Sequence, residues 1–249
     1  MVKIYSNLPS LGHEEFFQFP DPLIGKFFDG LVAIGGNLSP GILLSAYKQG
    51  IFPWYSGGPI RWYSPDPRCV FKLPQFHLPT SMKKLLRKNF FQMTCDTEFD
   101  KVIKHCANFH KAIHLETWIN NNMIAAYIHL HHLGFAHSIE VWQNDQLVGG
   151  LYGVSLGKMF FGESMFHLVP NASKAAFYGL IEICLERGID VIDSQVKNHH
   201  TEFLGGIDIT QEEYLQLLAD RVNAPASNLP WKQKINSSLS SVFGVVQNV

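Results

Sequence analysis

The order of elements between residues 137 and 196 constrains the fold most. Residues 137–142 alternate apolar and polar side chains, with Ile139 and Val141 on one face, which is the period of a half-buried strand. The elements expected after it are a turn at 143–146, strands at 147–154 and 158–165, a helix at 171–187 that Gly188 ends, and a strand at 189–196. Strands in succession, then a helix and another strand, predict a mixed α/β domain.

The first 70 residues differ in character, because they are rich in proline, glycine and aromatic side chains. A strand is expected at 31–34, and a helix at 40–49 with Ser39 as its N-cap and Pro40 as its first residue. The prolines of residues 51–68 predict rigid loops. Later helices are expected around 99–107 and at 121–133. We therefore expect an α/β (α+β) protein with a small N-terminal α/β domain (1–70), a mixed-sheet domain (71–235) and a loosely ordered tail (236–249).

The composition excludes several classes of protein. Hydrophobic residues make up 46% of the chain and charged residues 16%, which supports a folded core. The four cysteines form no CxxC pair, as is usual for reduced thiols. No N-terminal signal is visible, and no apolar run approaches the ~18 residues that cross a bilayer. We expect a cytoplasmic protein without a membrane partner.

Ten short stretches, taken together and in order, resemble the leucyl/phenylalanyl-tRNA–protein transferases. They are residues 30–40 (GLVAIGGNLSP), 46–47 (AY), 50–54 (GIFPW), 62–68 (WYSPDPR), 117–119 (TWI), 137–142 (HSIEVW), 147–154 (LVGGLYGV), 161–166 (FGESMF), 171–174 (NASK) and 192–196 (IDSQV). The resemblance covers roughly residues 28–218 and rests on the whole set. The order of elements in the larger domain is also similar to the core of the acetyltransferase-like (GNAT) fold.

The resemblance implies an aminoacyltransferase. It would move leucine or phenylalanine, with methionine left open, from an aminoacyl-tRNA to the α-amine of proteins that begin with Arg or Lys, which directs them to N-degron degradation. Because an amide replaces an ester, no ATP, metal or other cofactor is expected, and the enzyme must position the amine and the ester and manage the proton. A monomer is the default expectation.

Tryptophans are expected to bind the donor. The resemblance implies that Trp54 and Trp118 hold the terminal adenosine, since single-stranded bases stack on aromatic faces. Ordinary packing is the alternative for both rings. Tyr47 and Tyr127 are placed with them among the substrate-binding residues.

Glu163 stands in an apolar stretch, where a carboxylate without a partner is costly. The resemblance implies that it lines the aminoacyl pocket or contacts the aminoacyl amino group; pairing with a Lys or Arg is the alternative. The apolar pocket for the leucine or phenylalanine side chain is assigned to Leu151, Phe160, Met165, Ala176 and Phe177. Each of these could equally belong to an ordinary core.

Asp193 and Gln195 are the expected catalytic residues. Two apart on a strand, their side chains should share one face, with Ile192, Ser194 and Val196 facing away. The resemblance implies that the pair orients the acceptor amine: Asp193 would hold the ammonium, Gln195 would fix the geometry, and Asn198 would assist. The sequence leaves open whether Asp193 takes a proton or only orients the amine, and whether the tRNA assists the reaction. A hydrogen-bond network that supports the sheet edge is the structural alternative.

Four basic residues, Lys83, Lys84, Arg87 and Lys88, are expected on a helix capped by Ser81. In a chain with a net charge of −1 they are a local patch, which we expect to contact tRNA phosphates; a solvated helix face is the alternative. His129, His131 and His132 lack a carboxylate at helical spacing, so no metal site is expected. Ser164 lacks the second glycine of a nucleophile elbow.

Two other functions remain open. An acetyl-CoA-dependent N-acetyltransferase would need a glycine-rich turn before its long helix, and residues 168–173 contain no glycine. A non-enzymatic tRNA-binding module would use Trp54 and the basic patch, but would have no use for the pair Asp193 and Gln195.

Overall fold

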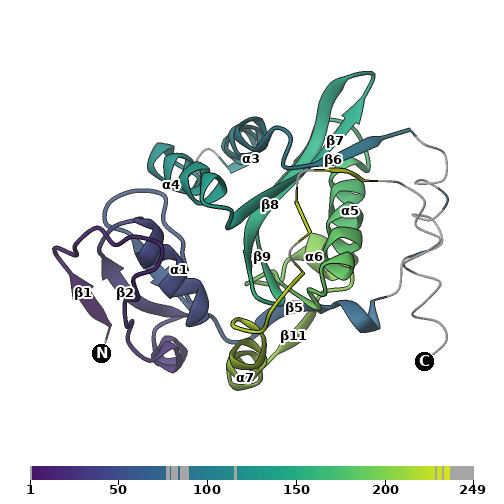
Figure 1. Ribbon diagram of the computed structural model, residues 1–249. Coiled ribbons are helices and arrows are strands. Elements are labelled where there is room, and N and C mark those ends of the chain that lie inside the picture. The colour runs from purple at the N-terminus through teal and green to yellow at the C-terminus, as the bar shows by residue number, and fades with distance from the viewer. Residues whose placement is uncertain are drawn as a thin grey trace.

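Two β-sheets organise the chain. The computed structural model describes residues 2–76, 79, 84, 90–114, 117–227, 229–231 and 233–235. In this part of the chain a four-stranded sheet has the order β1-β2-β4-β3, and an eight-stranded sheet has the order β11-β5-β10-β9-β8-β7-β6-β12. The small sheet and α1 lie on one side of the large sheet (Figure 1).

The small sheet uses the first 63 residues. Its elements are β1 (Lys3–Tyr5), η1 (Pro22–Phe27), β2 (Leu31–Gly35), α1 (Pro40–Lys48), β3 (Phe52–Pro53) and β4 (Arg61–Tyr63). Ser39 is the N-cap of α1 and Pro40 follows it, as expected from the sequence. The expectation of loops alone over 51–68 was wrong, because β3 and β4 pair with each other there.

The large sheet contains the pattern expected between residues 137 and 196. Its strands are β5 (Arg68–Lys72), β6 (Gln92–Cys95), β7 (Ala136–Gln143), β8 (Gln146–Leu156), β9 (Met159–His167), β10 (Val191–Asp193), β11 (Ile207–Ile209) and β12 (Gln233–Ile235). The helices and 3₁₀ turn that accompany it are η2 (Leu73–Gln75), α3 (Phe99–His114), α4 (Asn121–His132), α5 (Ala172–Glu186), α6 (His199–Phe203) and α7 (Gln211–Arg221). An antiparallel meander β7-β8-β9 is followed by α5 and by β10, which lies parallel to β9. The mixed α/β class and this order of elements are confirmed.

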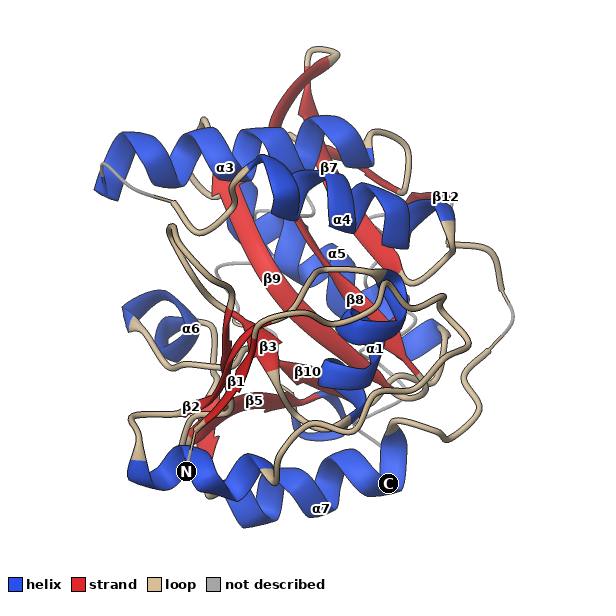
Figure 2. Ribbon diagram, turned by 90° about the vertical axis from the view of Figure 1, so that its left-hand side faces the viewer, coloured by secondary structure: helices blue, strands red, loops and turns tan. Residues whose placement is uncertain are grey.

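Helices cover both faces of the large sheet (Figure 2). Leu151 of β8 packs in a core with α5, whereas its neighbour Tyr152 packs in the core that contains α3 and α4. Successive side chains of a strand point to opposite faces, so these two cores lie on opposite sides of the sheet. A site beside the part of β9 that extends beyond its ladder with β10 can therefore draw residues from both cores.

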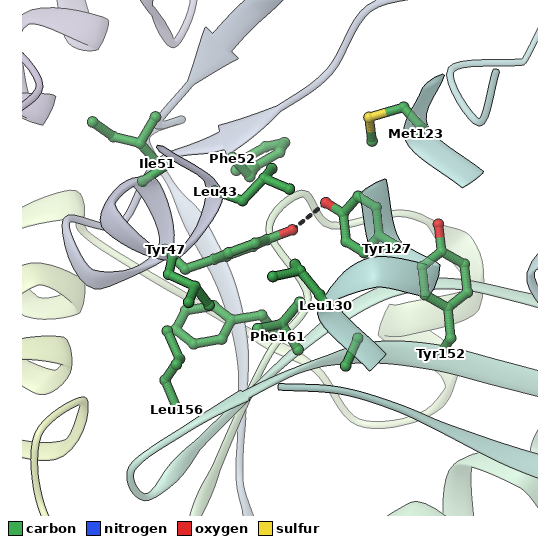
Figure 3. Close-up of a cluster of buried hydrophobic side chains, with 14 of the residues drawn as sticks. Leu43, Tyr47, Ile51, Phe52, Met123, Tyr127, Leu130, Tyr152, Leu156 and Phe161 are labelled. Atoms are coloured by element: carbon green, nitrogen blue, oxygen red, sulfur yellow. Dashed lines mark hydrogen bonds between the residues drawn. The ribbon is translucent and has the colours of Figure 1, made fainter. Parts of the chain in front are cut away.

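The small sheet shares a core with the large one. Tyr47 of α1 and Phe161 of β9 have ring centroids 5.1 Å apart, and both belong to the core that includes α3 and α4 (Figure 3). The change of sheet falls between Tyr63 and Arg68, a few residues before the boundary expected at residue 70. Residues 236–249, expected to form a loose tail, lie outside the described residues. None of the helices in the described ranges is long and apolar enough to span a membrane.

Candidate active site

A cavity opens where β9 and β10 separate. The parallel ladder between them runs from Val191 and Met159 to Asp193 and Phe161. β9 continues beyond this ladder to His167, whereas β10 ends at Asp193. Side chains from both cores line the resulting space of about 460 Å³, among them Leu151 and Tyr152.

Apolar residues form most of the cavity wall. Leu151, Met165 and Phe177, expected in the pocket, do line it, together with Phe52, Phe71, Phe109, Leu180, Ile192 and Leu204. Phe160 and Ala176 are not among the lining residues, which differs from the expectation. Both are fully buried in the core between the sheet and α5, because their positions on β9 and α5 turn them inward.

Two tryptophans reach the cavity from different elements. Trp54 follows β3 and is 44% exposed, and Trp118 lies between α3 and α4 and is half-buried. The Trp118 ring lies 4.5 Å from the ring of His110, and the Trp54 ring lies 5.8 Å from that of Tyr63. The structure thus brings together the two rings that were expected to bind the adenosine.

Glu163 occupies a β-bulge that faces the cavity. On β9, Gly162 pairs with Gly153 and Ser164 pairs with Tyr152, which leaves Glu163 as the extra residue of the ladder. Bulges re-aim side chains and recur beside active sites. The Tyr47 hydroxyl donates to Oε1 of Glu163 at 2.6 Å, and the Tyr127 hydroxyl donates to Oε2 at 3.1 Å.

The two tyrosines stand behind this carboxylate. Neither lines the cavity, and their hydroxyls also hydrogen-bond each other (Figure 3). Burial raises the pKa of Glu163 to about 7, although both tyrosine hydroxyls oppose this rise. Among the described residues Glu163 has no ion pair with a lysine or arginine, so the structure disfavours that alternative.

Asp193 faces away from the cavity. Its side chain is fully buried and forms a two-pronged ion pair with Arg68, with Nε to Oδ1 at 2.9 Å and Nη2 to Oδ2 at 2.7 Å. The Tyr214 hydroxyl and the backbone N–H of Gln195 donate to the same carboxylate. Burial alone would lower the pKa of Arg68, but the adjacent Asp193 carboxylate raises it overall. This places Asp193 behind the cavity wall.

The expected alternation along residues 192–196 was therefore wrong. Ile192, Ser194 and Val196, expected to face away, line the cavity together with Gln195. The reason is local: β10 ends at Asp193, and Gln195 has a left-handed backbone with φ of 56°, so the period of two is lost. Asn198 also lines the cavity, and its side-chain oxygen caps α6.

Two groups at the site were not expected from the sequence. Nε2 of His110 lies 2.9 Å from Oγ of Ser164, and both residues line the cavity beside Glu163. Arg68, the partner of Asp193, stands within the WYSPDPR stretch. A buried arginine needs a carboxylate partner, but nothing in the sequence identifies which one.

Asp96, His131 and His137 form a cluster with metal-ligand atoms within 4.8 Å of one another. Their hydrogen bonds give it a structural explanation, since His137 contacts Asp96 at 2.6 Å and His131 contacts the carbonyl of Ala136 at 2.8 Å. Of the four expected phosphate-binding residues, Lys84 is exposed, and Lys83, Arg87 and Lys88 lie outside the described residues.

Comparisons with known proteins identify the family of this chain. Residues 70–219 match the family model described as leucyl/phenylalanyl-tRNA protein transferase, and residues 36–66 match the model of its N-terminal domain. A leucyl/phenylalanyl-tRNA–protein transferase from Anaeromyxobacter sp. (strain K) is 44% identical over 215 residues, which cover 86% of this chain and 92% of that protein. The protein of the same name from Lawsonia intracellularis is 45% identical over 229 residues, or 92% and 100% of the two chains. A solved structure of a conserved protein of unknown function from Bacteroides thetaiotaomicron is 12% identical, with a TM-score of 0.40 over 65% of this chain and 57% of that one. The two family models and the curated relatives show that this chain belongs to the leucyl/phenylalanyl-tRNA–protein transferase family.

Proposed function

We propose that this protein transfers leucine or phenylalanine from an aminoacyl-tRNA to the α-amine of proteins whose first residue is arginine or lysine. The observation that carries the proposal is the apolar cavity of about 460 Å³, with Trp54, Trp118 and Glu163 in its wall, in a chain of this family. The donor substrate agrees with the family name. The basic first residue of the acceptor is an inference from the resemblance.

The cavity suits an aliphatic or an aromatic side chain. Moving a methylene group or an aromatic ring from water into contact with this apolar wall is favourable. Met165 lies in that wall, and an unbranched thioether adapts to ligands of different shape. Leucine and phenylalanine are thus both compatible with the same pocket.

The terminal adenosine of the tRNA fits the two tryptophans. Stacking on an aromatic ring contributes ~1–3 kcal/mol per base, and an exposed ring such as Trp54 is available for it. Phosphate contacts are assigned to Lys83, Lys84, Arg87 and Lys88, which would position the acceptor stem without reading its sequence.

The acceptor amine is assigned to the side of the cavity near Gln195. Gln195 and Asn198 line the wall there and carry side-chain amides that can orient an amine. Asp193 contributes indirectly, because its carboxylate holds the backbone amide of Gln195 at 2.9 Å. This replaces the expectation that Asp193 binds the ammonium itself.

The transfer reaction tests the proposal directly. Labelled leucine on tRNA is incubated with the protein and with an acceptor that begins with Arg, without ATP, added metal or CoA. A matched acceptor that begins with Glu is the control. We expect label on the first acceptor only. Acetylation from acetyl-CoA without leucine transfer would indicate an N-acetyltransferase instead, and tRNA binding without either reaction would indicate a binding module.

A further inference from the structure

The transfer reaction must move a proton. When a neutral α-amine attacks an ester, the nitrogen gains a positive charge and has to release a proton, while the departing ribose oxygen has to gain one. A side chain that lines the cavity and alternates between two protonation states could do both.

Asp193 is not free to accept a proton. Oδ1 of Asp193 accepts from Nε of Arg68 and from the backbone N–H of Gln195. Oδ2 accepts from Nη2 of Arg68 and from the Tyr214 hydroxyl. Two donors on each oxygen use the lone pairs of a carboxylate, and the side chain is fully buried. A proton on Asp193 would also leave Arg68 buried without its counter-ion.

Glu163 differs from Asp193 in each of these respects. It lines the cavity, and each of its oxygens accepts one tyrosine hydroxyl, which leaves a second lone pair on each. Burial raises the pKa of Glu163 to about 7, close to neutral pH, where a general base is most effective. A carboxylate at this position can therefore both accept and release a proton.

The two tyrosines give that proton a defined place. Tyr47, Tyr127 and Glu163 make three mutual oxygen–oxygen contacts. Two phenol protons can fill only two of them while Glu163 is ionised. A third proton, on Glu163, closes a ring in which Oε2 donates to Tyr127, Tyr127 donates to Tyr47, and Tyr47 donates to Oε1. The protonated carboxyl group therefore needs no movement of the neighbouring heavy atoms, only a rotation of the Tyr127 hydroxyl from Oε2 of Glu163 towards Tyr47.

We propose that Glu163 is the general base of the transfer, with Tyr47 and Tyr127 as its positioning residues. As the amine nitrogen bonds to the ester carbon, Glu163 takes a proton from that nitrogen. The bond between the carbon and the ribose oxygen then breaks, and Glu163 gives the proton to that oxygen. The products are a peptide bond and a tRNA with a free hydroxyl, and Glu163 is restored as a carboxylate. This inference rests on the proposed function.

Charged and titratable groups around Glu163 come from several elements. Tyr47 of α1 and Tyr127 of α4 lie behind it, and Tyr152 of β8 lines the cavity. Burial raises the pKa of all three phenols, so they remain neutral. Arg68 of β5 lowers the pKa of Glu163, and Asp193 of β10 raises it. Because these two form an ion pair, their effects on Glu163 oppose each other.

The first experiment compares wild type with Glu163→Gln, an isosteric change that removes the base. With saturating leucyl-tRNA, kcat/KM for an acceptor peptide that begins with Arg is measured from about pH 5.5 to about pH 9. The free amine (pKa ~8) and the ionised Glu163 are both required, so log(kcat/KM) of wild type should rise by about two per pH unit on the acid side. Glu163→Gln should show a slope of about one and a kcat at least ~100-fold lower.

Two controls separate catalysis from binding and folding. The affinity for a tRNA carrying leucine through an amide, which cannot react, should stay within about threefold of wild type. Tyr47→Phe removes one donor to the carboxylate, so the pKa of Glu163 should rise and the acid limb should move to higher pH. Thermal unfolding of both variants shows whether they are folded.

Three results would overturn the proposal. The first is a Glu163→Gln variant in which log(kcat/KM) still rises by two per pH unit. The second is a Glu163→Gln variant that binds the donor tRNA more weakly but keeps the kcat of wild type. The third is an acid limb that does not move in folded Tyr47→Phe. Failure of the proposed function is a separate outcome, because then the wild-type protein itself would transfer no leucine.

Discussion

The ion pair between Arg68 and Asp193 holds a buried aspartate behind the cavity wall, out of reach of a substrate. Both side chains are almost wholly buried, and the guanidinium also contacts the Gly50 carbonyl and the Tyr214 hydroxyl. The network joins β5, β10 and α7 behind the cavity wall. We therefore expect Arg68 and Asp193 to affect activity only through the backbone that they hold, as at Gln195.

Asp193→Asn tests this interpretation. The change leaves Arg68 buried without a counter-ion, so we expect the free energy of unfolding, measured in urea, to fall by ~3–5 kcal/mol. The double variant Arg68→Met with Asp193→Leu should lose less, because no charge is left unpaired. An Asp193→Asn protein as stable as wild type but without transfer activity would instead make Asp193 a catalytic residue.

Single residues of the site were predictable to different degrees. A carboxylate in an apolar stretch was sufficient to single out Glu163, since burial of a charge is costly wherever the chain folds. The orientation of Asp193 was not predictable, because it depends on Arg68, 125 residues away, and on the left-handed backbone of Gln195. Long-range pairing and a single positive φ leave no local pattern in the sequence.

At the scale of elements, two glycines, Gly153 of β8 and Gly162 of β9, face each other beside the bulge on β9. A Cβ at Gly153 would lie 2.2 Å from the carbonyl oxygen of Phe161 and 2.5 Å from the Phe160 ring. A Cβ at Gly162 would meet only the carbonyl oxygen of Asp193, at an ordinary 3.7 Å. Residue 162 thus has room for a side chain, whereas its partner, residue 153, has none.

Gly153→Ala should therefore destabilise the protein far more than Gly162→Ala. The clash in the first is with backbone and with a buried ring, so β8 and β9 must move apart, at a cost of ~1–3 kcal/mol or more. Urea unfolding of the two variants provides the measurement, with each serving as the control for the other. Equal stabilities would show that the bulge tolerates a side chain at residue 153.

The long strands and helices were predictable because each carries a full period of its pattern. β7, β8, β9, α4 and α5 were expected within a few residues of their bounds. The short strands β10 and β11 have three residues each, too few to show an alternation; β11 is an edge strand that pairs with β5, and β10 lies between β5 and β9. The bulge at Glu163 is equally invisible in the sequence, since an extra residue in one strand has meaning only relative to its partner.

The whole molecule places the cavity between parts that are distant in sequence. Phe52 and Trp54 follow α1 in the N-terminal part, whereas Leu151 and Met165 belong to the large sheet, and all four line one cavity. Tyr47 and Glu163 connect the same two parts through a hydrogen bond. A shared apolar core lies behind these contacts, so the geometry of the site depends on the two sheets folding together.

This shared core predicts a single unfolding transition. Leu43 of α1 and Leu130 of α4 are both fully buried in it, one on each side of the contact between the sheets. Leu43→Ala and Leu130→Ala should each lower the stability by ~2–5 kcal/mol and shift the same transition, because either cavity weakens the common core. Urea unfolding followed by tryptophan fluorescence and by far-ultraviolet circular dichroism should give coincident curves for both variants. An early fluorescence transition in Leu43→Ala alone would mean that the N-terminal sheet unfolds independently, and that the wall carrying Trp54 can detach while the large sheet stays folded.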